Sequence, residues 1–205
     1  IGIQSDYTII DPGDCADIIS IIETEHGMDK VKDFPRSSQL VSAHSKALNT
    51  NQSLEDTLFD MLGKWKYMEI ERFIPDIKKI LADYQSYKKQ NNMMDYDDLL
   101  INFISVLKRN PSIKNKLADI YQYIMIDEYQ DSNAVQERIF QAVSRNGKNL
   151  FMVGDVKQSI YRFRLADPSI FLSKYDAYPP LGEQDPGEPR KLLLSQNFRS
   201  RPEIL

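Results

Sequence analysis

The sequence predicts an α/β protein in which a helical subdomain precedes a small parallel sheet. Two short apolar runs, residues 123–126 and 149–153, each end in polar side chains. An uninterrupted apolar run of this length is typical of a strand buried on both faces, as in parallel sheets. Val135, Ile139 and Val143 lie between the runs at helical spacing. Because strand, crossover helix and strand form a right-handed βαβ unit, we expect both strands to run parallel in one sheet.

Five helices are expected before that unit, and each has its own start signal. Apolar residues recur at helical spacing after each start, and Asp, Ser and Pro are favoured at helix N-termini. The expected helices begin near Asp11-Pro12, Pro35, Ser53, Pro75 and Asp95. Ser53 with Asp56 predicts a capping box, and Trp65 is expected in the apolar stripe that follows it. Ser132 or Asn133 is the expected N-cap of the crossover helix.

Composition narrows the class of protein. The 205 residues can form one large domain or two small ones. A net charge of −4 argues against a simple basic module that wraps DNA, but allows a motor that grips one strand in a local groove. One Cys and two His exclude an internal disulfide and disfavour a zinc site. The lone Cys15 also fits a reducing cytoplasm, where we expect the protein. No apolar run of bilayer length and no signal peptide is visible, so no membrane partner is expected.

The polar residues after the two predicted strands carry the chemistry. Asp127 and Glu128 follow the first strand, and Gly154 and Asp155 follow the second, with Gln158 close behind. Ligands of parallel sheets bind outside the carboxyl ends of the strands, so these side chains are expected at one edge. Nucleotide hydrolysis needs one carboxylate to hold Mg²⁺ and another polar group to position or deprotonate water. The alternative is that the two acids simply open a surface loop.

A set of motifs, in a fixed order, resembles the UvrD/Rep/PcrA helicases of superfamily 1. The resemblance implies a partial RecA-like P-loop NTPase sheet, termed domain 1A, with a helical 1B subdomain. Residues 1–110 would be the 1B-like subdomain, 111–178 part of motor domain 1A, and 179–205 a connector and the start of motor domain 2A. The residues of motif III also resemble the AddA/RecB branch. The motifs are Ile-Asp-Glu-Tyr-Gln-Asp-Ser at 126–132 (motif II), Gly-Asp-Val-Lys-Gln-Ser-Ile-Tyr-Arg-Phe-Arg at 154–164 (motif III), Leu-Ser-Gln-Asn-Phe-Arg-Ser at 194–200 (start of motif IV), the helix opening at 94–100 and the 1B-like start at 5–11.

The resemblance assigns roles to the nucleotide-binding side chains. Asp127 would bind the Mg²⁺ of ATP, and Glu128 would be the general base for the attacking water. Gln158 would sense the γ-phosphate, a role that suits an amide because it both donates and accepts. The alternative for Gln158 is a loop residue that bonds to backbone. The remaining implied nucleotide contacts are Gln130 and Asp131, which would connect the site to neighbouring motifs, Phe198, which would stack on adenine, and Arg199, which would contact the γ-phosphate.

A DNA-binding segment is implied in motif III. Aromatic and guanidinium side chains alternate there, and such alternation suits a single strand because rings stack on bases while arginines meet phosphates. The alternative is a partly buried aromatic with a snorkelling arginine. Elsewhere, Lys78, Lys79, Lys88 and Lys89 form either a solvated helix face or a contact with duplex phosphates. The segment consists of Tyr161, Arg162, Phe163 and Arg164.

The sequence has no P-loop, which requires Gly, four residues and then Gly-Lys-Ser/Thr. The pairs Gly63-Lys64 and Gly147-Lys148 both fail this pattern. We therefore expect an internal piece of a larger ATP-dependent DNA helicase, inactive alone, whose parent moves 3′ to 5′ on single-stranded DNA and unwinds duplex junctions in repair or recombination. Two alternatives stay open. One is the helicase component of an AddAB-type helicase–nuclease, whose partner would be a nuclease or repair subunit. The other is a non-hydrolysing module that binds DNA or a partner.

Overall fold

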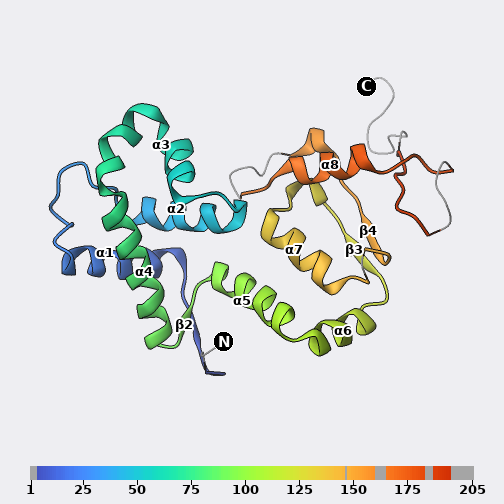
Figure 1. The fold of residues 1–205 in the computed structure, drawn as a ribbon, viewed down its shortest axis with the longest axis horizontal. Coiled ribbons are helices and arrows are strands. Elements are labelled where there is room, and N and C mark those ends of the chain that lie inside the picture. The colour runs from blue at the N-terminus through green and yellow to red at the C-terminus, as the bar shows by residue number, and fades with distance from the viewer. Residues whose placement is uncertain (1–3, 146, 160–164, 183–186, 195–205) are drawn as a thin grey trace, which may run out of the picture.

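A computed structural model describes residues 4–145, 147–159, 165–182 and 187–194 as two lobes (Figure 1). The helical lobe contains α1 to α4 with the short strands β1 and β2; the sheet lobe contains α5 to α8 with β3 and β4. The first lobe consists of β1 (Thr8–Ile9), α1 (Pro12–Glu25), α2 (Ser37–Thr50), α3 (Leu54–Ile70), the 3₁₀ turn η1 (Glu71–Phe73), α4 (Ile74–Gln90) and β2 (Met93–Met94). The second consists of α5 (Tyr96–Arg109), α6 (Pro111–Ile120), β3 (Ile124–Ile126), η2 (Tyr129–Asp131), α7 (Ala134–Val143), β4 (Leu150–Met152), η3 (Val156–Gln158) and α8 (Pro168–Ala177).

The helical lobe is built around one apolar cluster. Ile19 of α1, Leu40 of α2 and Ile77 of α4 are completely buried in it. Burying one such side chain contributes about 1.5–3 kcal/mol, so this cluster holds the lobe together. The expectation of an all-helical subdomain was incomplete, because β1 and β2 pair in parallel. The β-branched residues at 8–10 favour an extended start, and the parallel partner strand follows only after the four helices.

The predicted N-caps are confirmed where local sequence determines them. Asp11 accepts hydrogen bonds from the backbone N–H groups of Gly13 and Asp14, and Pro12 occupies the first turn of α1. Asp95 and Asn133 cap α5 and α7, each in a reciprocal capping box. Of the two N-caps proposed for α7, Asn133 is therefore the correct one. The expected box at Ser53 is only half formed, because the Asp56 carboxylate binds the Ser53 hydroxyl rather than its backbone N–H.

The prediction for Trp65 was wrong. Its side chain is 81% exposed, whereas Leu58 on the same helix is buried. Gly63 interrupts α3 with φ 74° and ψ 163°, a conformation that glycine adopts readily because it has no Cβ. The helical phase that places Leu58 in the core is therefore lost before Trp65 is reached.

The sheet lobe contains the predicted βαβ unit. β3 and β4 pair in parallel with Ile124 opposite Leu150 and Ile126 opposite Met152, and α7 connects them. The expectation that both faces are buried was wrong, since Met125 is 79% and Phe151 is 56% exposed. Alternate residues of each strand are half buried, which is the pattern of a sheet covered on one face only. Within the described residues this sheet has two strands, and the exposure of Met125 and Phe151 shows that none of these residues forms a layer over the other face.

The junction between the lobes is largely helical. α5 packs against α6 and α7, and α2 reaches across to contact both α5 and α7 (Figure 1). None of the helices in the described ranges combines the length and apolarity that a bilayer crossing requires. The mixed α/β class is confirmed as a mostly helical chain with small parallel sheets.

A buried ion cluster joins α4 to the start of α5. Lys88 is only 1% exposed, and its Nζ lies 2.5 Å from Oδ2 of both Asp95 and Asp98. The hydroxyl of Tyr84 donates to Asp95, and the Lys88 ammonium lies over the Tyr84 ring. Burial opposes ionisation of Asp95, but its bond to Lys88 prevails and lowers its pKa, while burial raises the pKa of Asp98. Lys88 is therefore neither a solvated residue nor a phosphate contact.

Replacing Lys88 by Met is expected to lower the free energy of unfolding by about 3–5 kcal/mol, because one buried and one half-buried carboxylate lose their cation. Urea unfolding of the 205-residue chain measures this change. Lys89→Met is the matched control, since Lys89 is exposed one position further along the same helix; its effect should stay within about 0.5 kcal/mol. Equal stability of the two variants would contradict the structural role given to Lys88.

Candidate functional site

The carboxyl ends of β3 and β4 lie side by side at one edge of the sheet. The backbone N–H of Val153 donates to the carbonyl of Ile126, and the N–H of Tyr129 donates to the carbonyl of Val153, both at 2.8 Å. These bonds extend the pairing beyond the strands themselves. As a result, the residues after Ile126 and those after Val153 share one edge, as the parallel βαβ unit predicts.

A sharp turn places two carboxylates at this edge. Asp127 and Glu128 are both exposed, and the Glu128 N–H donates to Oδ1 of Asp127 at 2.9 Å. Glu128 has left-handed backbone angles, φ 51° and ψ 39°, a region that residues with a Cβ visit sparingly. The chain therefore turns directly from β3 into η2. We call residues 127–132, which include both carboxylates and η2, the acidic turn.

Gln130 connects the two strand ends through its side chain. It is completely buried, its Nε2 donates to Oε2 of Glu128 at 2.5 Å, and its Oε1 accepts from the N–H of Asp155 at 3.0 Å. Both ends of one amide are thereby used, one on each strand end. The position and orientation of the Glu128 carboxylate thus depend on the segment that follows β4.

Gly154 makes room for this amide. A Cβ at position 154 would lie 2.6 Å from Oε1 of Gln130 and 3.0 Å from a ring carbon of Phe171. Both distances are shorter than ordinary contacts, so no larger residue fits without moving Gln130 or Phe171. Glycine is required here by close approach rather than by its backbone angles.

Gln158 lies in η3, which follows the segment that bonds to the acidic turn. Its Nε2 donates to Oδ2 of Asp155 at 3.1 Å, and Asp155 also caps η3 by accepting from the N–H of Lys157. The hydrogen bond from Gln158, followed by that from the Lys157 backbone, lowers the pKa of Asp155. Gln158 is exposed, and its link to Glu128 runs through Asp155 and Gln130.

Tyr129 anchors the acidic turn to α7 and α8, a role that sequence reasoning missed. It is buried, its hydroxyl donates to Glu137 of α7, and its ring lies 6.2 Å from the ring centroids of Phe140 and Phe171. Burial raises the pKa of the Tyr129 phenol, so it stays a neutral donor. The available signal was a large aromatic ring flanked by polar side chains, because such a ring gains more free energy from burial than its polar neighbours do.

Of the remaining predicted site residues, only Asp131 lies among those that the structure describes. Asp131 lies at the end of η2, and its Oδ1 is buried without a hydrogen-bond partner among the described residues. Six others lie outside the described residues, so their roles stay predictions. They are Tyr161, Arg162, Phe163, Arg164, Phe198 and Arg199.

The donor set at this edge fits a magnesium–nucleotide complex better than a protein-only metal cage. Among the described residues, no group of three or more His, Cys, Asp or Glu side chains is arranged to hold a metal ion. Mg²⁺ in nucleotide enzymes is held by one or two carboxylates, with substrate phosphates and water completing its octahedron. The exposed Asp127 beside Glu128 provides such carboxylates.

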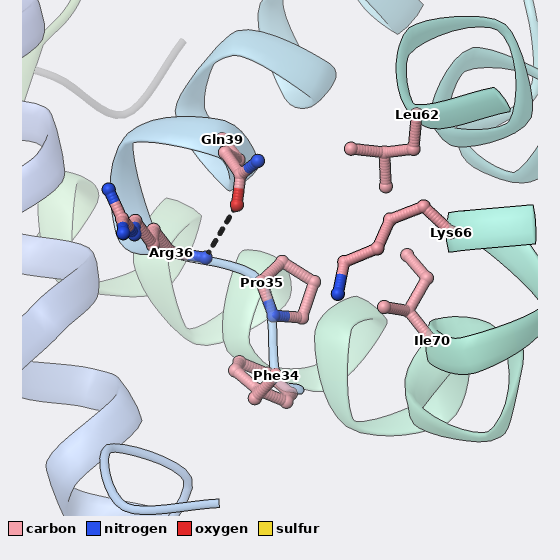
Figure 2. A pocket seen from close by; sticks show the side chains of 7 residues that line it. All are labelled: Phe34, Pro35, Arg36, Gln39, Leu62, Lys66 and Ile70. Atoms are coloured by element: carbon pink, nitrogen blue, oxygen red, sulfur yellow. Dashed lines mark hydrogen bonds between the residues drawn. The ribbon is translucent and has the colours of Figure 1, made fainter. Parts of the chain in front are cut away.

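Two cavities lie away from this edge. The first, of about 280 Å³, is in the helical lobe between the start of α2 and the far end of α3, and Lys66 extends across it toward Pro35 (Figure 2). The ammonium of Lys66 also pairs with Glu69 at 2.8 Å. The second lies where α2, α5 and α7 meet. Neither is lined by a residue of the acidic turn.

Comparison with known proteins identifies the family. The family model described as "UvrD/REP helicase N-terminal domain" matches residues 1–179. The exonuclease/helicase subunit RexA of Lactococcus lactis subsp. cremoris is 40% identical over 179 residues, covering 85% of this chain and 14% of that protein. An ATP-dependent helicase/nuclease subunit of Desulfitobacterium hafniense is 50% identical over 130 residues, covering 60% of this chain and 9% of the relative.

A third relative, an ATP-dependent helicase/nuclease subunit of Syntrophomonas wolfei, is 43% identical over 163 residues, covering 78% of this chain and 13% of that protein. The chain thus spans about one seventh of the length of the curated relatives it matches. The family match covers most of the chain, including the acidic turn and the segment after β4. The chain therefore belongs to the UvrD/REP helicase N-terminal domain family.

Proposed function

We propose that the protein carrying this chain is a cytoplasmic ATP-dependent DNA helicase, and specifically the helicase component of a helicase–nuclease that acts in repair or recombination. The relatives are named as subunits that combine helicase with nuclease or exonuclease, which supports the helicase–nuclease branch and a partner in the form of a second subunit. In this proposal β3 and β4 are part of a RecA-like motor sheet, and the helical lobe corresponds to a 1B subdomain. Movement 3′ to 5′ along single-stranded DNA is implied by the family resemblance.

One observation carries the hydrolytic part of this proposal. The acidic turn and the segment after β4 share one sheet edge, and Gln130 links Glu128 to Asp155 there. Polar groups at the carboxyl ends of neighbouring parallel strands are the usual setting of a nucleotide site in an α/β protein. The surface-loop alternative does not require a buried amide with both ends engaged.

The side chains divide the chemistry of hydrolysis among them. Asp127 would hold Mg²⁺, which supplies charge neutralisation on the phosphates when bound. Glu128 would accept a proton from the attacking water, and its bond to Gln130 would orient the carboxylate. Gln158 would contact the terminal phosphate, and its hydrogen bond to Asp155 would couple that contact to the segment after β4. From the second motor domain, Arg199 would bind the γ-phosphate and Phe198 would stack on adenine.

Glu128→Gln in the full-length protein is expected to lower kcat for DNA-stimulated ATP hydrolysis by about 10²–10⁴-fold, because the amide cannot accept the proton. Nucleotide binding should change by less than about threefold, since the substitution is isosteric. Phosphate release and a nucleotide titration measure the two effects. Glu25→Gln, at an exposed position of α1, is the matched control. Near-parental turnover of Glu128→Gln would remove Glu128 from the base role, and a parent without hydrolysis would favour the non-hydrolysing module.

Gly154→Ala is expected to lower kcat about tenfold, because the new Cβ would displace Gln130 and loosen the Glu128 carboxylate. Steady-state hydrolysis at saturating ATP measures the change. If the effect passes through Gln130, the double variant Gln130→Ala with Gly154→Ala should have the same kcat as Gln130→Ala alone. A parental rate in Gly154→Ala, or additive losses in the double variant, would show that the space left by Gly154 is not needed to position the Gln130 amide.

Phe163→Ala is expected to weaken single-stranded DNA binding by about 1–3 kcal/mol, the usual contribution of one base–aromatic stack. A fluorescence titration of a short labelled single-stranded oligonucleotide with the full-length protein measures the affinity. The control is Phe59→Ala, which removes an exposed ring from α3. Unchanged affinity and unchanged DNA stimulation would assign the Phe163 ring to packing instead.

A further inference from the structure

Asn49, near the end of α2, is a buried amide far in sequence from the acidic turn. It is 4% exposed. Its Nδ2 donates to the carbonyl of Ser45 at 2.9 Å and to Oδ1 of Asp97 at 2.6 Å, while its Oδ1 accepts from Nδ2 of Asn133 at 3.2 Å. Every bond depends on the amide having both donors and an acceptor. No isosteric replacement satisfies all three partners, since Leu offers neither function and Asp places a second carboxylate beside Asp97.

Both tertiary partners of Asn49 sit at helix N-termini. Asp97 is in the first turn of α5, beside the capping residue Asp95. Asn133 is the N-cap of α7, and its Oδ1 is occupied by the N–H of Gln136, which leaves its Nδ2 for Asn49. The end of α2 is therefore attached to the starts of two helices of the sheet lobe.

The Asn133 end of this chain of bonds adjoins the acidic turn directly. Asn133 follows Ser132, which is buried and whose N–H donates to the carbonyl of Tyr129. The carbonyl of Ser132 in turn accepts from the N–H of Asp167 at 2.9 Å. Both backbone groups of Ser132 are thus hydrogen-bonded. We therefore expect a displacement of Asn133 to move the acidic turn instead of being absorbed by backbone rotation at Ser132.

The Asp97 end adjoins the ion cluster that holds α4. Asp95 and Asp98, which bind Lys88, occupy the same turn of α5 as Asp97. α2 and α4 thus both attach to the start of α5, and Asn49 continues that attachment to α7. Buried polar contacts of this kind fix one geometry, because each partner left alone costs its full desolvation.

We propose that Asn49 is a positioning residue for ATP hydrolysis, acting through Asn133 to hold the acidic turn in register with the helical lobe. This inference rests on the proposed function for its catalytic consequence, and on the hydrogen bonds alone for its structural part. The bond between Asn49 and Asn133 is the step that carries the coupling.

Asn133→Ser in the full-length protein separates the two roles of Asn133. Serine is an equally good N-cap, so α7 keeps its start, but it has no amide to donate to Asn49. We expect kcat for ATP hydrolysis to fall about tenfold and KM for ATP to change by less than about twofold, with the melting temperature lowered by several degrees because the Asn49 Oδ1 loses its donor. Asn49→Ala should give the same kcat, and the double variant should lose nothing further.

Arg138→Ala is the matched control, because Arg138 donates to Asn51 at 2.7 Å, so the substitution removes an exposed bond between the same two segments. A merely structural connection of α2 to α7 would make this control behave like Asn133→Ser. Additive losses in the double variant, or equal losses in the control, would overturn the proposal.

Amide hydrogen exchange of residues 127–132 tests the structural part independently of activity. Asn133→Ser should speed exchange there about tenfold. The N–H groups of Tyr129, Asp131 and Ser132 are protected by hydrogen bonds to the carbonyls of Val153, Glu128 and Tyr129, and these bonds open when the acidic turn loosens. Unchanged exchange would overturn the proposal whatever the ATPase shows. Faster exchange in a parent that does not hydrolyse ATP would leave the positioning intact and reject the proposed function. Faster exchange with a parental kcat would reject the catalytic consequence.

Discussion

The parallel pairing of β3 with β4 is the constraint on which the geometry of the candidate site depends. Two backbone bonds through Val153, one to Ile126 and one from Tyr129, extend that pairing past the strands. Because strand side chains alternate with a period of two, a slip by one residue would turn Ile124 and Ile126 outward. It would also carry Gln130 away from Asp155, so the register of three residue pairs sets the geometry of the Glu128 carboxylate.

Sequence reasoning succeeded where a few neighbouring residues determine the outcome. Asp11, Asp95 and Asn133 cap helices because each has backbone N–H groups within three positions to satisfy, a requirement visible in the sequence. The βαβ unit was equally predictable, since the handedness of a crossover follows from strand twist and not from distant contacts. The position of Asp127 and Glu128 at the sheet edge follows from that topology alone.

It failed where burial depends on contacts between different elements or on a break in periodicity. Trp65 is exposed because Gly63 shifts the helical phase, which counting apolar positions assumes to be continuous. Lys88 stands in a lysine-rich stretch, and only the fold brings Asp95 and Asp98 to it. The fit of Gly154 against Gln130 is likewise a contact across two strand ends, which neither local sequence reveals.

The polar contacts at the junction between the lobes have a physical reason. Apolar contact alone between α2 and α7 would gain free energy over a range of sliding positions, because burial of apolar area is not directional. Asn49, Asp97 and Asn133 instead satisfy one another at one arrangement, and the buried ion cluster of Lys88 adds a second fixed point on α5. Such groups add little net stability, since desolvation offsets most of their attraction. Their contribution is to make any displacement of the helical lobe costly unless the start of α7 moves with it, which would keep the acidic turn in place if the proposed hydrolytic function is correct.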